Sequence, residues 1–313
     1  MTKTINILIT LAILSLNGAC QKTVDKKVNQ SNKVDLKWKI EDDKILAYKT
    51  IMEQVDIGEI EMPSQTLFDK ILKSDPGNID KYYDQIKKFF ESFYEGFENY
   101  SIITVLEKRE DNNIDVKMVY GDFSEKQNTD EPDAADEKSL FKNIMKGVQL
   151  RGIINENGGI ESFYTKRDQK NLLAAFFQLP EHSINIGDKW ELEINWLTTD
   201  HYFICQKADR INEVQLIDVV KRDGETIGIL KYEIYEKVDG NFKSPLGKGP
   251  TPTMMEMRLE GICEFSITAG KWKNYSGLLS FKSTGYQNVS YKQKYALIEL
   301  EVIPEKVYDY IEK

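Results

Sequence analysis

The alternation of apolar and polar residues in the second half of the chain constrains the fold more than any other feature. Between residues 190 and 196, apolar side chains alternate with charged or polar ones: Trp190, Leu192, Ile194 and Trp196 against Glu191, Glu193 and Asn195. Similar runs follow at residues 214–220, 228–238, 259–268, 275–283 and 295–302. A period of two is typical of a β-strand with one buried face. Because turn signals such as Arg222-Asp223-Gly224 separate the runs, we predict an antiparallel meander from residue 184 onward.

The first half combines strands with amphipathic helices. Strand patterns occupy residues 35–40, 46–52, 101–107, 114–120, 149–154 and 159–164, and helical patterns occupy residues 64–72, 75–99, 140–148 and 168–177. The longest predicted helix opens with Asp75-Pro76, an N-cap residue followed by proline at the first helical position. Its aromatic and aliphatic residues fall on one face, which predicts that this helix packs on a sheet.

The first twenty residues are typical of an export signal that ends at a lipid-attachment cysteine. Lys3 precedes a mostly apolar stretch over residues 5–16, which is shorter than the roughly 20 residues that span a bilayer. Two small residues then lead into Cys20, an arrangement that resembles the lipobox of bacterial lipoproteins, although Asn17 stands where leucine is preferred. The resemblance implies cleavage before Cys20 and acylation of its thiol. A plain signal peptide that happens to contain a cysteine is the alternative.

These patterns predict an α+β fold in which curved antiparallel sheets, built as meanders, carry a few amphipathic helices on one face. The expected segments are a signal peptide over residues 1–19, a lipidated cysteine and flexible tether over residues 20–34, an α+β module over residues 35–180 and a mainly antiparallel β module over residues 181–313. A tryptophan strand opens each half, at Trp38 and at Trp190. Two related modules are therefore an open alternative.

Composition and charge indicate an acidic, folded body. The chain is 41% hydrophobic and 30% charged, with a formal net charge of −9. This charge argues against nucleic-acid binding, which needs a basic face, and against electrostatic adhesion to anionic lipid. We therefore expect an exported protein, anchored to a bacterial membrane by acyl chains on Cys20. The outer membrane is the expected one, and its periplasmic and surface sides both remain open.

Cys205 and Cys263 are the two cysteines other than Cys20. Each has the parity of apolar neighbours within a predicted strand, which places both on the buried face. An exported compartment permits a disulfide between them, and two buried free thiols are the equal alternative. No histidine flanks either residue, so a catalytic thiol is not expected.

The sequence offers little material for catalysis or metal binding. Its two histidines, His182 and His201, belong to no metal-binding motif, and the sequence lacks nucleophile-elbow, phosphate-loop and paired-cysteine motifs. Glu191 and Glu193 project from one face of a predicted strand about 7 Å apart, but any solvent-facing strand shows such alternating acids. We expect no cofactor, no metal site and no enzymatic activity.

The run FQLPEHSINIGDKW, residues 177–190, resembles a signature of uncharacterised Bacteroidota-type lipoproteins, in which Leu-Pro is followed by Gly-Asp-x-Trp before a strand. The resemblance covers residues 150–281, and the matching positions are Pro180, Gly187, Asp188 and Trp190. A structural role explains them, because Gly187 and Asp188 suit a turn and Trp190 can anchor the next strand in the core. The family has no assigned activity, so the resemblance implies no reaction.

We therefore expect a membrane-anchored envelope lipoprotein that acts as a non-catalytic binding or structural module. Its expected partners are the membrane, through Cys20, and another envelope protein or a polymer. One alternative is a carrier of an apolar, lipid-like ligand beneath the helix predicted over residues 75–99. A further alternative is a hydrolase whose residues no motif reveals.

Overall fold

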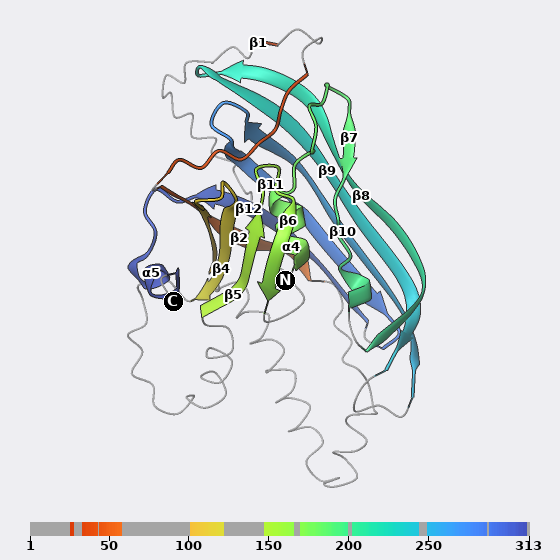
Figure 1. Cartoon of the computed structure of the whole chain (residues 1–313). Helices are drawn as coiled ribbons and strands as arrows, with labels where there is room; N and C mark the ends of the chain where they lie inside the picture. The colour runs from red at the N-terminus through yellow and green to blue at the C-terminus, as the bar shows by residue number, and fades with distance from the viewer. Residues whose placement is uncertain are drawn as a thin grey trace, which may run out of the picture.

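The computed structural model describes residues 26–27, 33–42, 44–57, 101–121, 147–165, 170–199, 202–243, 249–286 and 288–311. Within these ranges the chain forms one 12-stranded antiparallel sheet (Figure 1). The strands are β1 (Lys26–Lys27), β2 (Ile45–Ile57), β3 (Ser101–Lys108), β4 (Ile114–Gly121), β5 (Gly147–Ile154), β6 (Ile160–Thr165), β7 (Lys189–Glu191), β8 (Phe203–Arg222), β9 (Glu225–Phe242), β10 (Thr251–Ser266), β11 (Lys271–Thr284) and β12 (Val289–Glu299). The helices are α4 (Lys170–Phe177), the 3₁₀ turn η2 (Leu197–Thr199) and α5 (Glu305–Ile311).

The order of the strands joins the two halves of the chain. It runs β1-β8-β9-β10-β11-β12-β2-β3-β4-β5-β6, and β7 pairs with β8 beside this path. The central junction is the antiparallel pair β12–β2, in which Tyr295 lies opposite Met52 and Leu297 lies opposite Thr50. Strands from both sides of residue 180 therefore belong to one sheet.

The predicted α+β fold is wrong. The described part of the chain is mostly β, with one open antiparallel sheet and only 8% helix, rather than several sheets covered by helices or two related modules. Of the predicted helices, the one over residues 168–177 is found as α4, and those over residues 64–72, 75–99 and 140–148 lie outside the described residues. The strands of the second half are longer than their apolar patterns, since β8 has 20 residues and β9 has 18.

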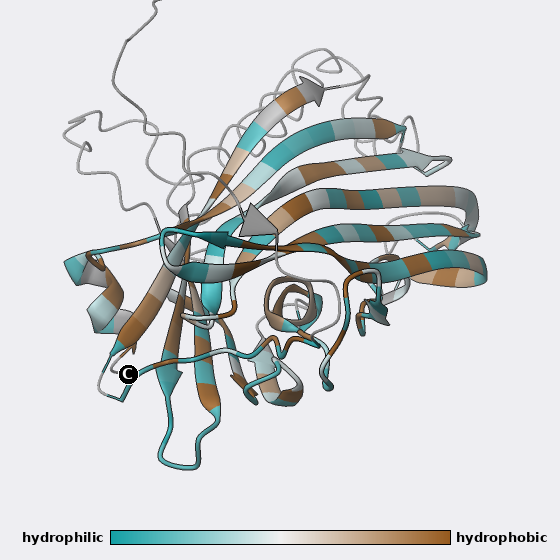
Figure 2. Cartoon of the chain, turned by 90° about the horizontal axis from the view of Figure 1, so that it is seen from above, coloured by the Kyte–Doolittle hydropathy of each residue, from teal (hydrophilic) through white to brown (hydrophobic). Residues whose placement is uncertain are grey.

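The sheet is curved, and its concave face carries the main hydrophobic core. Figure 2 shows α4 lying inside the curve of the strands. The rings of Trp38, Phe177, Phe265 and Trp272 meet at the centre of this core, with Trp38 5.4 Å from Phe177, 5.3 Å from Phe265 and 5.9 Å from Trp272 between centroids. On the opposite, convex face, α5 covers a smaller cluster that includes Ile103 and Val105.

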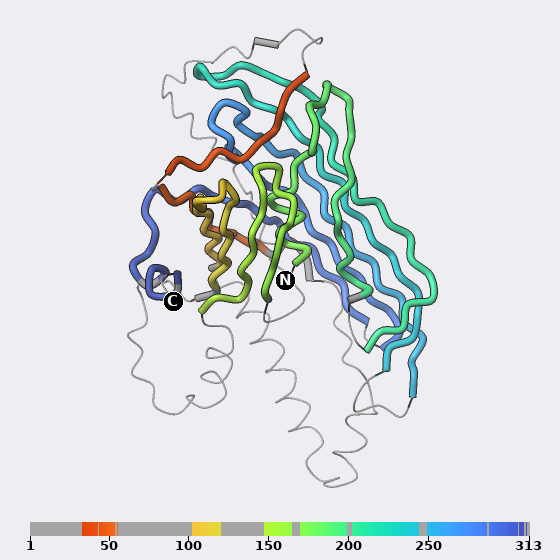
Figure 3. Tube along the Cα trace, viewed as in Figure 1, coloured from red at the N-terminus to blue at the C-terminus, as the bar shows by residue number. Residues whose placement is uncertain are grey.

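Residues 33–42 cross the end of the sheet before β2 begins (Figure 3). The sequence pattern predicts a strand over residues 35–40, and the alternation of buried Leu36, Trp38 and Ile40 is present. Their backbone nevertheless bonds to loops, because Trp38 N donates to Glu156 O at 2.8 Å and Lys39 N donates to Gly270 O at 3.0 Å. The segment is thus extended and buried on one side without joining the sheet.

The predicted turn at Arg222-Asp223-Gly224 is confirmed. It joins β8 to β9, and Asp223 (φ 51°) and Gly224 (φ 82°) both adopt positive φ. Two central residues with positive φ match the right-handed twist of a two-stranded ribbon. Among the described residues, this turn ends the hairpin with the longest strands, since β8 has 20 residues and β9 has 18.

Candidate binding site on the concave face

Helix α4 fills one end of the concave face and is held there by its own carbonyl groups. The last carbonyls of a helix lack intrahelical partners, and in α4 aromatic side chains of the core supply them. The donors are Trp38 Nε1 to Phe177 O (2.8 Å), Trp272 Nε1 to Phe176 O (2.8 Å) and Tyr275 OH to Ala175 O (2.7 Å). The helix is therefore an integral part of the core.

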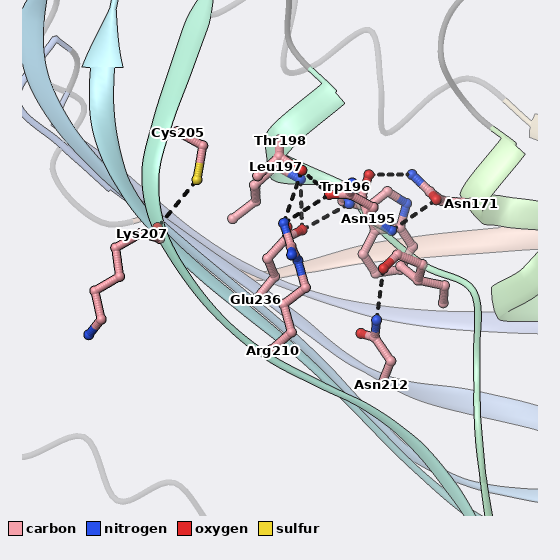
Figure 4. Close-up of polar contacts among 11 residues, drawn as sticks. Asn171, Asn195, Trp196, Leu197, Thr198, Cys205, Lys207, Arg210, Asn212 and Glu236 are labelled. Carbon is pink, nitrogen blue, oxygen red and sulfur yellow. Dashed lines mark hydrogen bonds and ion pairs between the residues drawn. The ribbon is translucent and has the colours of Figure 1, made fainter.

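A buried carboxylate, Glu236 of β9, holds the segment that follows β7. The side chain of Glu236 is 3% exposed. One of its oxygens accepts the backbone N–H groups of Trp196 (2.8 Å) and Leu197 (2.7 Å), and the other accepts Nε of Arg210 (2.8 Å), as Figure 4 shows. The carboxylate therefore satisfies the first N–H groups of η2 and neutralises a cation from β8.

Asparagine side chains extend this network to α4 and β8. Asn171 of α4 binds both backbone groups of Asn195, donating from Nδ2 to its carbonyl at 2.9 Å and accepting its N–H at 3.0 Å. Asn212 of β8 donates to the carbonyl of Ile194 at 2.7 Å, and Arg210 donates to Oδ1 of Asn195 at 3.2 Å. These contacts fix residues 194–198 across the concave face.

The chemistry of this network is structural. Both oxygens of Glu236 accept hydrogen bonds from within the chain, and its charge is offset by Arg210. A general base needs an oxygen that can reach a substrate proton, and both oxygens of this buried carboxylate are already engaged within the chain. Within the described ranges, no group of three or more histidine, cysteine or acidic side chains is placed to hold a metal ion.

Beyond the network, the concave face ends in a group of half-buried apolar side chains, here called the distal patch. Its members are Trp196, Cys205, Phe242, Met255, Leu279 and Phe281, around the buried residues Leu197, Phe203, Val238 and Met257. Met257 lies opposite both Glu236 and Phe281, so the patch begins in the same row of the sheet as the buried carboxylate. Two ring pairs border it, with Phe242 stacked on Tyr286 at 4.4 Å and Phe281 beside Tyr291 at 5.3 Å.

The polar groups at the other side of the network are deeply buried. Cys263 is fully buried, and its burial raises the pKa of the thiol to about 12. Burial likewise raises the pKa values of the hydroxyls of Tyr232, Tyr275 and Tyr295. At neutral pH these groups are protonated, so that none is a ready nucleophile.

Cys205 and Cys263 are free thiols, and the sheet keeps them apart. Cys205 lies opposite Gly240, which in turn lies opposite Thr253 of β10. Cys263 is ten residues farther along β10, a distance of about 33 Å at strand geometry. A bridge between the two thiols of one chain is therefore sterically impossible, and Cys205 is half-buried whereas Cys263 is fully buried.

The signature residues build the connection between α4 and β7. Gly187 has φ 98°, and Asp188 accepts the backbone N–H of Asn185 at 2.8 Å, which gives the turn that the sequence predicts. Trp190 lies in β7 and packs half-buried against the core, and the carbonyl of Pro180 accepts Nδ2 of Asn157 at 2.8 Å. These contacts are structural, and the four side chains do not converge on one site.

The other residues considered from sequence are placed as follows. His182, Glu191 and Glu193 are exposed. Cys20 and His201 lie outside the described residues. Sequence reasoning missed the Arg210–Glu236 pair, although a signal existed: Glu236 has the same parity as the buried residues Tyr232, Ile234 and Val238. A lone charge at an inward position of a strand indicates a buried, paired carboxylate.

Comparison with known proteins identifies no similar protein. No protein-family model, no curated protein and no solved structure matches this chain. Among the described residues, no helix is both long and apolar enough to cross a membrane.

Proposed function

We propose that this chain is a lipid-anchored protein of the bacterial cell envelope that acts as a non-catalytic binding or structural module. The observation that carries the proposal is the apolar run over residues 5–16 followed by Gly18-Ala19-Cys20. The three acyl chains of a lipoprotein give firm attachment, because one chain alone binds marginally. The occupied oxygens of Glu236 support binding rather than catalysis at the concave face.

Phase partition in Triton X-114 tests the anchor. The chain expressed in a bacterial host is expected in the detergent phase, and Cys20→Ala is expected to move it to the aqueous phase. Cys205→Ala is the matched control and should leave the protein in detergent. Detergent partition of the Cys20→Ala protein would contradict the anchor.

A carrier of an apolar, lipid-like ligand is the second candidate, and the distal patch favours it. The helix predicted above such a ligand, residues 75–99, lies outside the described residues, so the argument rests on the sheet alone. The apolar members of the patch are half-buried, whereas the other end of the concave face is filled by α4. Apolar surface with this exposure suits an acyl chain.

Substitutions at two adjacent leucines test whether the protein carries a ligand or has only a structural role. Leu279 belongs to the distal patch, and Leu278 is 37% exposed on the convex face. Native mass spectrometry of a Gln21–Lys313 body, exported behind a cleavable signal peptide and purified gently from the periplasm, should show an additional mass of lipid size. Leu279→Asp should abolish the additional mass and Leu278→Asp should retain it. A bare polypeptide mass for the unmodified body would remove the carrier from consideration.

A further inference from the structure

We propose that the end of the sheet formed by β1 and the β8–β9 turn faces the phospholipid surface to which the chain is anchored. The proposal rests on the lipid anchor at Cys20. It adds a direction, since an anchored protein on a long flexible tether would present no fixed side to the membrane. The partner is the layer of phosphate headgroups around the acyl chains.

The first argument is the short reach between the anchor and the sheet. Lys26 of β1 lies opposite Lys221 of β8, and Lys27 lies opposite Val220. Only six residue steps separate Cys20 from Lys26, which span at most about 21 Å when fully extended. The pairing of β1 therefore brings the anchor close to the last turn of the β8–β9 hairpin, instead of leaving residues 20–34 as one free tether.

The second argument is the charge of this end of the sheet. The whole chain carries a net charge of −9, yet cations gather here. Arg222 and Lys273 are paired with Glu264 (2.8 Å) and Glu225 (3.0 Å), and Lys39 donates to the carbonyls of Ile267 and Thr268 at 2.9 and 3.2 Å. The cations without an acidic partner among the described contacts are Lys39 and Lys221, to which the sequence adds the two lysines of β1.

The acids near these cations are Asp223, which is exposed, Asp218, which is half-buried, and Asp25, which precedes the two lysines of β1 in the sequence. Four lysines against three acids leave a balance of one positive charge at the end nearest the anchor, where headgroup phosphates are within a Debye length of the protein. The acyl chains supply the attachment, and the lysines select which end of the sheet lies against the membrane.

The length of the hairpin gives the orientation a measurable consequence. β9 extends from Glu225 to Phe242, which corresponds to about 56 Å at strand geometry. With the β8–β9 turn at the membrane, the far end of β9 and the distal patch point away from the bilayer. The patch is then presented to the aqueous side of the envelope.

Energy transfer to the membrane tests this orientation in the full, lipidated chain. Donor dyes are attached to Asp223→Cys or to Lys243→Cys, each in a Cys205→Ser background, and the protein is reconstituted in phosphatidylethanolamine–phosphatidylglycerol vesicles that contain an acceptor lipid. We expect transfer several-fold more efficient from position 223 than from position 243. Equal or reversed efficiencies in vesicle-bound protein would overturn the orientation, whereas protein that fails to float with vesicles would contradict the anchor instead.

Charge reversal tests whether the orientation depends on the lysines or only on the short link between Cys20 and β1. The triple change Lys26→Glu, Lys27→Glu and Lys221→Glu should reduce the contrast between the two dye positions at least twofold. The matched control, Lys207→Glu, Lys282→Glu and Lys292→Glu, alters the net charge equally at exposed lysines nearer the opposite end of the strands and should retain the contrast. If the difference in transfer efficiency between positions 223 and 243 is the same in both triple variants, the lysines do not determine the orientation.

Discussion

Glu236 shows at the residue scale how this sheet accommodates a charge on its inner face. Its three partners are two backbone N–H groups and the Arg210 guanidinium, all at 2.7–2.8 Å. A buried carboxylate is tolerated when its lone pairs are satisfied in this way, and removing it leaves its donors unpaired.

Glu236→Ala should therefore lower the free energy of unfolding by about 3 kcal/mol, because two N–H groups and a cation lose their acceptor. Glu233→Ala is the control on the same strand, where the carboxylate forms an exposed pair with Lys231 at 3.2 Å, and should cost less than about 1 kcal/mol. Urea unfolding of both variants measures the difference. Similar midpoints would show that the network contributes nothing to stability.

Two glycines with positive φ offer a second comparison. A methyl group at Gly158 (φ 74°) would lie 1.7 Å from the carbonyl oxygen of Phe177, whereas one at Gly224 (φ 82°) would meet nothing within 4 Å. Gly224→Ala should cost about 1 kcal/mol from backbone strain, and Gly158→Ala should cost several times more, because α4 must move. Thermal unfolding of the two proteins checks the ranking, and a larger loss for Gly224→Ala would contradict the contact.

The buried thiol predicts how stability depends on pH. Burial raises the pKa of Cys263 from its ordinary 9.0 to about 12. The folded state therefore favours the protonated thiol, so its contribution is complete below pH 9 and is lost as pH rises toward 12. Cys263→Ala should flatten this part of the stability profile in urea titrations between these pH values. An unchanged slope would place the thiol in contact with solvent.

At the scale of single elements, α4 depends on side chains from distant strands. Its last carbonyls are bonded by Trp38, Trp272 and Tyr275, so an eight-residue helix that would be marginal alone is fixed by the core. The core is therefore tightly packed at this end of the concave face, whereas the apolar side chains of the distal patch are half-buried.

Removal of one of these donors should be measurable. Tyr275→Phe leaves the carbonyl of Ala175 without its bond and should cost about 1–2 kcal/mol. Tyr232→Phe is the matched change, since the buried Tyr232 hydroxyl has no partner among the described side chains and backbone groups, and should be close to neutral. Differential scanning calorimetry compares the two, and an equal loss would refute the capping role.

Local sequence patterns predicted turns and helix α4 better than they predicted which strands pair. The Asp223-Gly224 turn, the Gly187-Asp188 turn and α4 were readable because each depends on neighbouring residues. Strand lengths were underestimated because polar residues interrupt the apolar pattern, as at Lys207–Asn212 of β8. The β12–β2 pair could not be read, because its partners lie more than 200 residues apart and no local pattern encodes their contact.

At the scale of the whole molecule, the single sheet makes a specific prediction about cooperativity. Trp38 and Trp272 lie in contact across the predicted boundary after residue 180. Far-ultraviolet circular dichroism and tryptophan fluorescence should therefore follow one coincident urea transition, and a fragment of residues 35–180 should remain unfolded. Two separate unfolding transitions, or a folded fragment of residues 35–180, would instead show that the chain contains two independently folding modules.

Less of the function than of the local structure could be predicted from the sequence. The N-terminal pattern predicts attachment to a membrane through Cys20, whereas the distal patch became visible only when strands distant in the chain were placed side by side. Its residues carry no motif, since half-buried apolar side chains have the same alternation as any core strand.

Mass spectrometry of the mature N-terminus tests the central claim, a lipid anchor at Cys20, most directly. Protein extracted from bacterial membranes and digested with trypsin should yield the peptide Cys20–Lys22, heavier by a diacylglyceryl group on the thiol and an acyl group on the amine. An unmodified Cys20 thiol, or a mature chain that begins at any other residue, would contradict the account.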